Sequence, residues 1–324
     1  MKKALITGIG GQDGAYLAYT LLLKGYLVFG TSRNFKQSNF KSLRALNIYH
    51  KVKILNINLL DFQSVVKCLS EVNPDEIYNL ASQSSVGKSF QQPLETFESI
   101  SNVTINILEG IKFVRKTIKF YSAGSSECFG NTGSKAANEN TIFNPLSPYA
   151  RAKANAFYEV VNYRKNYNLF ACTGILFNHE SPLRGSTFVT RKIIEVACRI
   201  AQGSSERLQL GNIKISRDWG WAPEYVESMW IMLQQSTPED YVIATGRTSS
   251  LEYFIELTFS ACGLDWKKWV DIDTNFFRPN DLIEGRADPS KAKRFLRWSS
   301  NLTLEQIIIR LVAVELGKIS IIET

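Results

Sequence analysis

The sequence predicts an α/β fold: a Rossmann-type, doubly wound parallel sheet with a smaller C-terminal substrate lobe. From residue 3 to about residue 176, short runs rich in β-branched residues alternate with helical stretches, as in a parallel sheet. A glycine-rich turn directly follows the first of these runs. The chain has 324 residues, 44% of them hydrophobic, which is enough to bury a large core. We expect one domain over residues 1–176 and a second lobe over residues 177–324.

Six buried strands are expected in the first domain, each a short apolar or aromatic run bounded by turn residues. Residues 15–24, between the first two strands, are apolar nearly all round. That pattern indicates a helix covered on more than one side, and Gly25 ends it. The strands are expected at residues 4–7, 27–30, 52–56, 76–80, 118–121 and 169–175.

Beyond Phe177 the alternation gives way to loops, helical stretches and short extended segments. We expect helices at residues 187–202 and 224–235 and a strand at residues 208–211. A further strand at residues 241–245 would bring the segment 221–246 back to the first domain. Near the end, Thr303 and Gln306 form a capping box that opens an amphipathic helix to Leu316.

The charge of the chain limits the classes of partner. The formal net charge of +8 could serve nucleic acid, a membrane surface or an anionic metabolite. No basic run is longer than two residues, whereas nucleic-acid-binding proteins cluster their charge on one face. Phosphorylated small molecules therefore fit better, and we expect no nucleic-acid partner.

Cysteine, histidine and hydropathy patterns indicate a soluble cytoplasmic protein with no metal. The five cysteines are widely spaced and include no C-x-x-C pair, as expected of buried thiols in a reducing cytosol. Two histidines, His50 and His179, are too few and too far apart for a convincing zinc site. No apolar stretch approaches the ~20 residues needed to span a bilayer, so no membrane association is expected.

Residues 7–14 read TGIGGQDG and form the glycine-rich turn. Gly8, Gly11 and Gly14 follow a predicted strand and open a predicted helix, which is the context that gives this motif its meaning. Glycines let the backbone approach a pyrophosphate, and the helix N-terminus favours its negative charge. The turn therefore predicts a dinucleotide cofactor; a tight turn with a purely structural role is the alternative.

The end of the second strand bears on which dinucleotide binds. Sites specific for NAD usually carry an acid there, which accepts hydrogen bonds from the ribose hydroxyl. Residues 30–34 read GTSRN, with no carboxylate. Arg33 and the neighbouring hydroxyl suit a 2′-phosphate, so NADP is favoured over NAD. Arg33 as an ordinary solvated residue remains the alternative.

Tyr149 and Lys153 have the spacing of a proton-transfer pair. Ser147 and Pro148 would begin a helix just after the fifth strand, and residues four apart on a helix share a face. A cation near the phenol favours ionisation of the tyrosine, which then acts as a base. The alternative is a Tyr and a Lys that merely pack on a surface helix.

Ser125, Ser126 and Glu127 follow the fifth strand, at the sheet edge where such folds bind ligands. One hydroxyl can orient a reacting alcohol. Glu127 adds a carboxylate that simple alcohol oxidation does not need, so it suggests an elimination. Taken alone, Glu127 is more often a solvated loop residue.

With these motifs the chain resembles the GDP-mannose 4,6-dehydratases, members of the extended short-chain dehydrogenase/reductase family, almost from end to end. The resemblance implies that residues 1–176 form an NADP-binding domain and residues 177–324 mainly a nucleotide-sugar-binding lobe. The matching segments are residues 7–14, 74–81, 125–127, 147–153, 174–182, 187–192, 210–212, 217–220 and 240–246.

This resemblance implies a mechanism. Tyr149, assisted by Ser125 and Lys153, would take the proton of the sugar 4-hydroxyl while the C4 hydride passes to NADP⁺. Glu127 would remove the C5 proton, water would leave C6, and the hydride would return to C6, giving a 4-keto-6-deoxy sugar. Ser126 stands where related dehydratases carry an acid, so Glu127 would both remove the proton and protonate the leaving water.

The resemblance also implies two sets of binding residues. The expected cofactor contacts are Gly8, Gly11, Gln12, Asp13, Gly14, Arg33, Asn58, Leu59, Leu80, Ala81, Tyr149, Lys153, Leu176, Asn178 and His179. The expected GDP-sugar contacts are Ser85, Ser125, Glu127, Tyr149, Asn178, Val189, Lys192, Leu210, Gly211, Arg217, Arg278 and Asp281.

The chain departs from the family pattern at Asn58, usually Asp, at Trp221, usually His, at Asp281, usually Glu, and over residues 33–44. The substrate is therefore open between GDP-mannose and a related GDP-sugar such as a GDP-heptose. A nucleotide-sugar reductase or epimerase of the same fold, or a non-catalytic NADP-binding sensor, are the other readings. The resemblance implies a homodimer through the Tyr149 helix and residues 94–114, with a homotetramer also open because residues 33–44 join dimers in the family.

Overall fold

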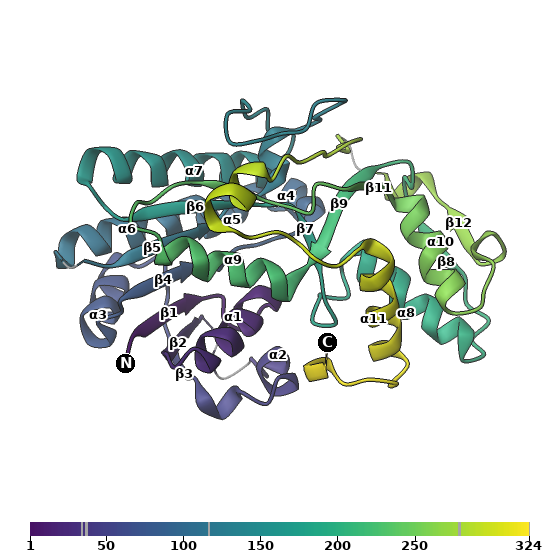
Figure 1. Cartoon of the computed structure of the whole chain (residues 1–324), viewed down its shortest axis with the longest axis horizontal. Helices are drawn as coiled ribbons and strands as arrows, with labels where there is room; N and C mark the ends of the chain where they lie inside the picture. Colours follow the sequence, from purple (N-terminus) through teal and green to yellow (C-terminus); the bar gives the residue numbers. More distant parts are fainter. Residues whose placement is uncertain (34, 36–37, 116, 278–279, 324) are drawn as a thin grey trace.

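The computed structural model describes residues 1–33, 35, 38–115, 117–277 and 280–323. Its centre is a parallel sheet with strand order β10-β6-β5-β4-β1-β2-β3 (Figure 1). The order reverses between β1 and β4, which makes the sheet doubly wound. The six strands predicted for the first domain and the strand predicted at residues 241–245 are all confirmed. Their bounds are β1 Lys3–Thr7, β2 Leu27–Ser32, β3 Lys53–Asn56, β4 Glu76–Asn79, β5 Lys119–Ala123, β6 Ala171–Leu176 and β10 Tyr241–Ile243.

Helices cover both faces of this sheet, which is why β4 and β6 are buried along their whole length. One face is covered by α1 (Gln12–Leu23) and α9 (Ala222–Gln234), which pack on each other. The other carries α3 (Phe62–Val72), α6 (Val103–Val114) and α7 (Pro148–Tyr167). Figure 1 shows the sheet between these two helical layers.

Residues 94–114, which the family resemblance places at a dimer contact, belong to an interrupted helix. It consists of α5 (Pro93–Phe97), a π-helical turn over Glu98–Asn102, and α6. Two further short helices, α2 (Lys41–Ala45) and α4 (Val86–Gln91), lie on connections of the first domain. A π turn inserts one extra residue into the helical ladder and often marks a functional region.

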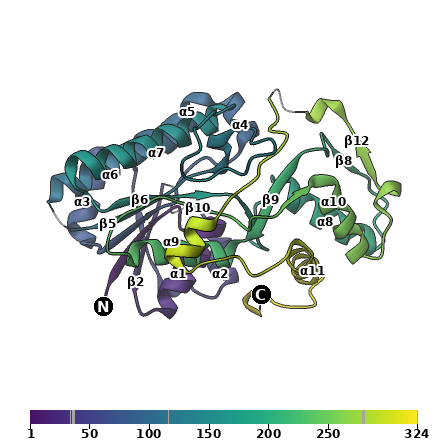
Figure 2. The same ribbon diagram turned by 45° about the horizontal axis from the view of Figure 1, so that its top comes forward.

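The second lobe has its own hydrophobic core and lies at one end of the molecule in both ribbon views (Figures 1 and 2). The helix predicted at residues 187–202, the strand predicted at 208–211 and the capping box of Thr303 with Gln306 are confirmed. Several short elements were not predicted individually, because three-residue strands carry almost no periodic signal. The lobe contains α8 (Val189–Ala201), α10 (Leu251–Ala261), α11 (Leu304–Glu315), β7 (Asn178–Glu180), β8 (Leu208–Leu210), β9 (Ser216–Trp221), β11 (Thr248–Ser250) and β12 (Val270–Ile272).

The segment 221–246 packs with the first domain, since α9 contacts α1 and β10 pairs with β6. The domain boundary at residues 176 and 177 stays a prediction. Among the described residues, no helix has the length and apolar character needed to cross a membrane.

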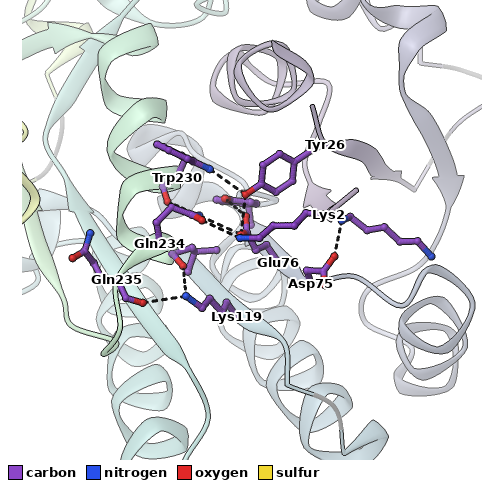
Figure 3. Close-up of polar contacts among 11 residues, drawn as sticks. Lys2, Tyr26, Asp75, Glu76, Lys119, Trp230, Gln234 and Gln235 are labelled. Atoms are coloured by element: carbon purple, nitrogen blue, oxygen red, sulfur yellow. Dashed lines mark hydrogen bonds and ion pairs between the residues drawn. The ribbon is translucent and has the colours of Figure 1, made fainter. Parts of the chain in front are cut away.

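A buried carboxylate joins α9 to the amino edge of the sheet. Glu76, 1% exposed at the start of β4, accepts hydrogen bonds from Tyr26 Oη at 3.0 Å and Tyr78 Oη at 2.7 Å. Lys2 Nζ at 3.0 Å and Gln234 Nε2 at 3.2 Å donate to the same group. Figure 3 shows Lys2, Tyr26 and Gln234 converging on Glu76, with Gln234 reaching it from α9. The cluster therefore fastens the C-terminal half of α9 to β4.

Replacing Glu76 with Leu should lower the free energy of unfolding by about 2–4 kcal/mol, measured by urea denaturation. The reason is that the buried hydroxyls of Tyr26 and Tyr78 lose their acceptor, at about 1–3 kcal/mol each. Lys2 adds little because its side chain is 51% exposed. Glu76→Gln should cost less, since one acceptor oxygen remains.

The matched control is Glu71→Ala, an exposed carboxylate on α3 that lies 3.9 Å from Lys67 Nζ. It should change stability by no more than about 0.5 kcal/mol. Equal effects at Glu71 and Glu76 would show that the buried cluster does not hold α9 in place.

Candidate active site

The glycine-rich turn lies between the end of β1 and the start of α1, where the backbone is too close for side chains. Gly8 has φ +72°, and a Cβ on Gly14 would lie 2.4 Å from the Gly8 carbonyl oxygen. Gly11 caps α1 without a side-chain hydrogen bond, so the first N–H groups of the helix have no side-chain cap. These groups and the helix dipole suit a pyrophosphate, so the residues present fit the predicted dinucleotide.

Two adjoining cavities, of about 500 Å³ and about 630 Å³, meet at this turn. The first extends over the ends of β2 and β3 and is lined by Arg33, Asn58 and Leu59. The second extends over the ends of β4, β5 and β6 into the second lobe. All fifteen residues predicted to contact the cofactor line one cavity or the other. Both lie at the carboxyl edge of the sheet and beside the point where the strand order reverses, as expected of a ligand site.

The candidate catalytic residues Ser125, Ser126, Glu127, Tyr149 and Lys153 all line the larger cavity. Two caps fix their positions. The Ser147 hydroxyl accepts a hydrogen bond from Ala150 N at 3.1 Å and starts α7, so Tyr149 and Lys153 lie in its first turns as predicted. The Ser125 hydroxyl accepts from Glu127 N at 3.3 Å and starts the short 3₁₀ turn Ser126–Phe129.

Burial shifts the proton affinities of Tyr149 and Lys153 in opposite directions. It raises the pKa of Tyr149, and a hydrogen bond with Ser125 offsets only part of this rise. Burial also lowers the pKa of Lys153 to about 8, while its Nζ donates to the Ala123 carbonyl at 2.8 Å. Desolvation is the largest influence on the phenol and leaves its pKa raised, so the expectation that Lys153 favours ionisation of the phenol stays a prediction.

Glu127 faces a cation from the second lobe. Arg217, 6% exposed on β9, places Nε 4.0 Å from Glu127 Oε1 and Nη2 3.8 Å from Asp281 Oδ1. The distances are those of loose ion pairs, so the guanidinium is shared between the two carboxylates. Glu127, the predicted C5 base, and Arg217, a predicted GDP-sugar contact, therefore lie in one site.

Asp13 and His179, both predicted cofactor contacts, line the larger cavity and contact each other. His179 Nε2 lies 3.0 Å from Asp13 Oδ2, and its ring stacks on Tyr225 at 4.6 Å between centroids. Burial alone would raise the pKa of Asp13, but the charge and hydrogen bond of His179 hold it at about 2. Opposing burial, Asp13 raises the pKa of His179. The pair fastens the start of α1 to β7.

The predicted GDP-sugar contacts are only partly brought together. Seven of them line the larger cavity: Ser85, Ser125, Glu127, Tyr149, Asn178, Val189 and Arg217. Lys192 lies outside this lining and donates to the Gln209 carbonyl at 2.8 Å, and Gly211 packs against the Phe276 carbonyl. Leu210 is buried in the core of the lobe, and Arg278 lies outside the described residues.

Two residues, Arg184 and Trp221, lie where the sequence did not lead us to expect them. Arg184 lines it from the loop after β7, pairs with Glu180 at 3.3 Å and stacks on the ring of Phe188 at 3.8 Å. A basic residue next to a Ser-Pro turn is the only signal the sequence offered. Trp221, by contrast, is buried in the core of the second lobe and does not belong to the cavity lining.

The sequence as a whole matches the family model described as GDP-mannose 4,6 dehydratase over residues 5–311. Among similar proteins, GDP-mannose 4,6 dehydratase 2 of Arabidopsis thaliana is 45% identical, covering 97% of this chain and 87% of that protein. The GDP-mannose 4,6-dehydratase of Vibrio cholerae is 43% identical, covering 97% and 94%. The Drosophila melanogaster enzyme of the same name is 44% identical, covering 95% and 84%.

The fold is also that of solved structures with much lower sequence identity. A dTDP-glucose 4,6-dehydratase from Bacillus anthracis in complex with NAD has a TM-score of 0.85 at 18% identity and covers 98% of this chain and 97% of its own. RMD from Pseudomonas aeruginosa, complexed with NADPH, has a TM-score of 0.80 at 19% identity, covering 98% and 100%. These likenesses show that the chain has the same fold as those structures.

The Asp13–His179 pair should make stability depend on pH in a defined window. Asp13 titrates at about 2 in the folded chain against 3.8 unfolded, so its contribution of about 2 kcal/mol is lost as pH falls from 4 to 2. The pKa of His179 is raised from 6.5, so its contribution is full below pH 6.5 and is lost as pH rises through that raised value. In Asp13→Asn, urea unfolding should show a shallower loss of stability between pH 4 and pH 2.

Glu71→Gln, which removes an exposed carboxylate, should leave the acid limb of that profile unchanged. If Asp13→Asn and the unmodified chain lose stability in parallel below pH 4, the pair is not charged in the folded protein.

Proposed function

The chain belongs to the GDP-mannose 4,6-dehydratase family, and we propose on this premise that it converts GDP-mannose to GDP-4-keto-6-deoxymannose with NADP as cofactor. One observation carries the proposal: a hydroxyl, a carboxylate, a phenol and an ammonium from Ser125, Glu127, Tyr149 and Lys153 line one cavity beside the glycine-rich turn. A sugar oxidised at C4 and eliminated across C5 and C6 needs these groups around a single ring.

The nicotinamide, when bound, accepts the C4 hydride and later returns it to C6. Within the chain, Tyr149 takes the proton of the 4-hydroxyl, and Ser125 orients that hydroxyl through its contact with the phenol. The base is the phenolate of Tyr149, since a protonated phenol cannot accept a second proton, and the Lys153 ammonium stabilises that phenolate. Burial opposes this by raising the pKa of Tyr149, so the cation beside it is needed for the step.

Glu127 then removes the C5 proton, which the 4-keto group has made acidic, and protonates the departing 6-hydroxyl. Arg217 lies beside Glu127. The same guanidinium offers a cation to the substrate diphosphate. Ser126, at the start of the same 3₁₀ turn, lines the cavity without an ionisable group, which leaves Glu127 as the acid and base of the elimination.

Two features support NADP over NAD. Arg33, Ser32 and Lys41 line the smaller cavity at the end of β2, where a 2′-phosphate would lie. The described residues of that lining include no carboxylate. Solved relatives of this fold carry either NAD or NADPH, so a nicotinamide dinucleotide is common to both.

A homodimer is part of the same proposal. Leu94, Phe97 and Tyr158 on α5 and α7 are exposed hydrophobic side chains on two helices that pack together. A second copy of this surface would cover them. The free thiols of all five cysteines support a reducing, cytoplasmic location.

The direct test is to incubate the purified chain with GDP-mannose and NADP and to follow the product by mass spectrometry. We expect a product lighter than the substrate by one water. A product from a GDP-heptose but not from GDP-mannose would refute mannose as the sugar. Neither product, in protein that binds NADP, would refute the proposed activity.

Glu127→Gln should lower kcat by about 10²–10⁴-fold, because it removes the acid and base of the elimination. Oxidation at C4 should survive, so a single turnover should accumulate reduced nicotinamide, visible by its absorbance. Tyr149→Phe is the contrasting variant, in which reduced nicotinamide should not form. Normal turnover of Glu127→Gln would sink the role assigned to Glu127.

A further inference from the structure

Two of the five cysteines, far apart in sequence, meet in the second lobe. Cys198 lies on α8 and Cys262 caps the C-terminal end of α10, and their Sγ atoms are 4.0 Å apart. Both are free thiols. The helices that carry them pack on each other at the end of the molecule away from the parallel sheet (Figures 1 and 2). Neither cysteine lines the two cavities of the candidate active site.

The two thiols are arranged as an attacking and a resolving sulfur. Cys262 is half-buried, whereas Cys198 is 2% exposed. The hydrogen bond from Cys198 and the positive charge of Lys318 lower the pKa of Cys262. The same hydrogen bond, together with burial, raises the pKa of Cys198. Thiolate character therefore concentrates on the sulfur that solvent reaches, which is the condition for reaction with an oxidant.

The other three cysteines provide an internal contrast. Cys68, Cys128 and Cys172 are buried in the first domain. Burial raises the pKa of Cys68 and of Cys128 to about 12 and raises that of Cys172 as well. Buried thiols of this kind are inert at neutral pH. Oxidation of the folded chain should therefore be selective.

We propose that Cys198 and Cys262 form a dithiol that a hydroperoxide oxidises to a disulfide between α8 and α10. The Cys262 thiolate attacks one peroxide oxygen, so an S–O bond forms, the O–O bond breaks and hydroxide leaves. The Cys198 sulfur then attacks the sulfenic sulfur, forming the S–S bond and expelling water. The dithiol loses two electrons and two protons, and hydrogen peroxide becomes two waters. The sulfurs must approach by about 2 Å, since an S–S bond is about 2.05 Å long.

The disulfide acts on the second lobe as a whole. It would join residues 64 apart in sequence, and closing a loop of that length restricts the unfolded chain. The oxidised lobe should therefore melt higher, by roughly 5–10 °C if the lobe and the first domain unfold together. The first turn of α8 lines the larger cavity through Val189 and Thr190, so the bond also anchors one wall of that cavity. The inference does not depend on the proposed function.

The test uses the intact chain, treated with a small excess of hydrogen peroxide, alkylated under denaturing conditions and mapped by mass spectrometry. We expect a Cys198–Cys262 linked peptide lighter by two hydrogens than the sum of its parts, with Cys68, Cys128 and Cys172 alkylated. The melting temperature should rise on oxidation and return with dithiothreitol.

Cys262→Ser is the matched variant, since a half-buried position tolerates a hydroxyl, and its melting temperature should not respond to peroxide. The peptide map of the unmodified chain tests the proposal even if that variant folds poorly. The proposal is overturned if Cys262 remains alkylatable after oxidation, if it reaches the sulfinic acid without joining Cys198, or if the linked partner is another cysteine.

Discussion

The close approach of β1, α1 and β4 at the glycine-rich turn is the constraint on which the rest of the structure depends. A side chain on Gly8 would lie 2.9 Å from the Ala81 backbone, and one on Gly14 would lie 2.7 Å from Ile9 Cα. Glycines at these positions let α1 begin close to the carboxyl end of β1, beside the point where the strand order reverses. This geometry aims the uncapped N-terminus of α1 at the junction of the two cavities, and it sets Asp13 where His179 can reach it. The predicted pyrophosphate site and the Asp13–His179 contact therefore both depend on the glycine-rich turn.

Helix α9 runs from the carboxyl edge of the sheet to its amino edge. At its first turns Tyr225 stacks on His179, beside the carboxyl edge where the cavities open. Near its last turns Trp230 Nε1 donates to Tyr26 Oη at 3.1 Å, and Gln234 reaches Glu76 at the amino edge. Glu76 is a buried carboxylate satisfied by several donors, an arrangement that holds elements firmly because the loss of the carboxylate would leave buried donors unpaired. Helix α9 follows α8 of the second lobe in sequence, yet through these contacts it packs with the first domain.

Patterns with a strong local cause could be predicted from the sequence, and contacts between distant segments could not. The buried strands of the sheet, the Ser147 and Thr303 caps and the glycine-rich turn each follow from a few neighbouring residues. Lys192 matched a family position, yet its ammonium donates to a carbonyl of β8, because the fold of the lobe and not its own helix decides where it points. Burial likewise decides the state of Tyr149 and Lys153, and spacing alone carries no information on burial. The meeting of Cys198 with Cys262, 64 residues apart, is of the same kind.

Burial sets the proton affinities of the two groups proposed to handle the first proton transfer. Excluding water raises the pKa of Tyr149 and lowers that of Lys153 to about 8, so two pKa values that are ordinarily close together move apart. A phenol that keeps its proton cannot accept another, so the proposed base is the phenolate, and burial works against it. The proposed role of Lys153 is to offset this cost by placing a cation beside the phenolate. Glu127, the proposed acid and base of the elimination, lies on a separate element beside Arg217, and its charge is one of the causes that raise the pKa of Tyr149, so the two proposed proton transfers are electrostatically linked.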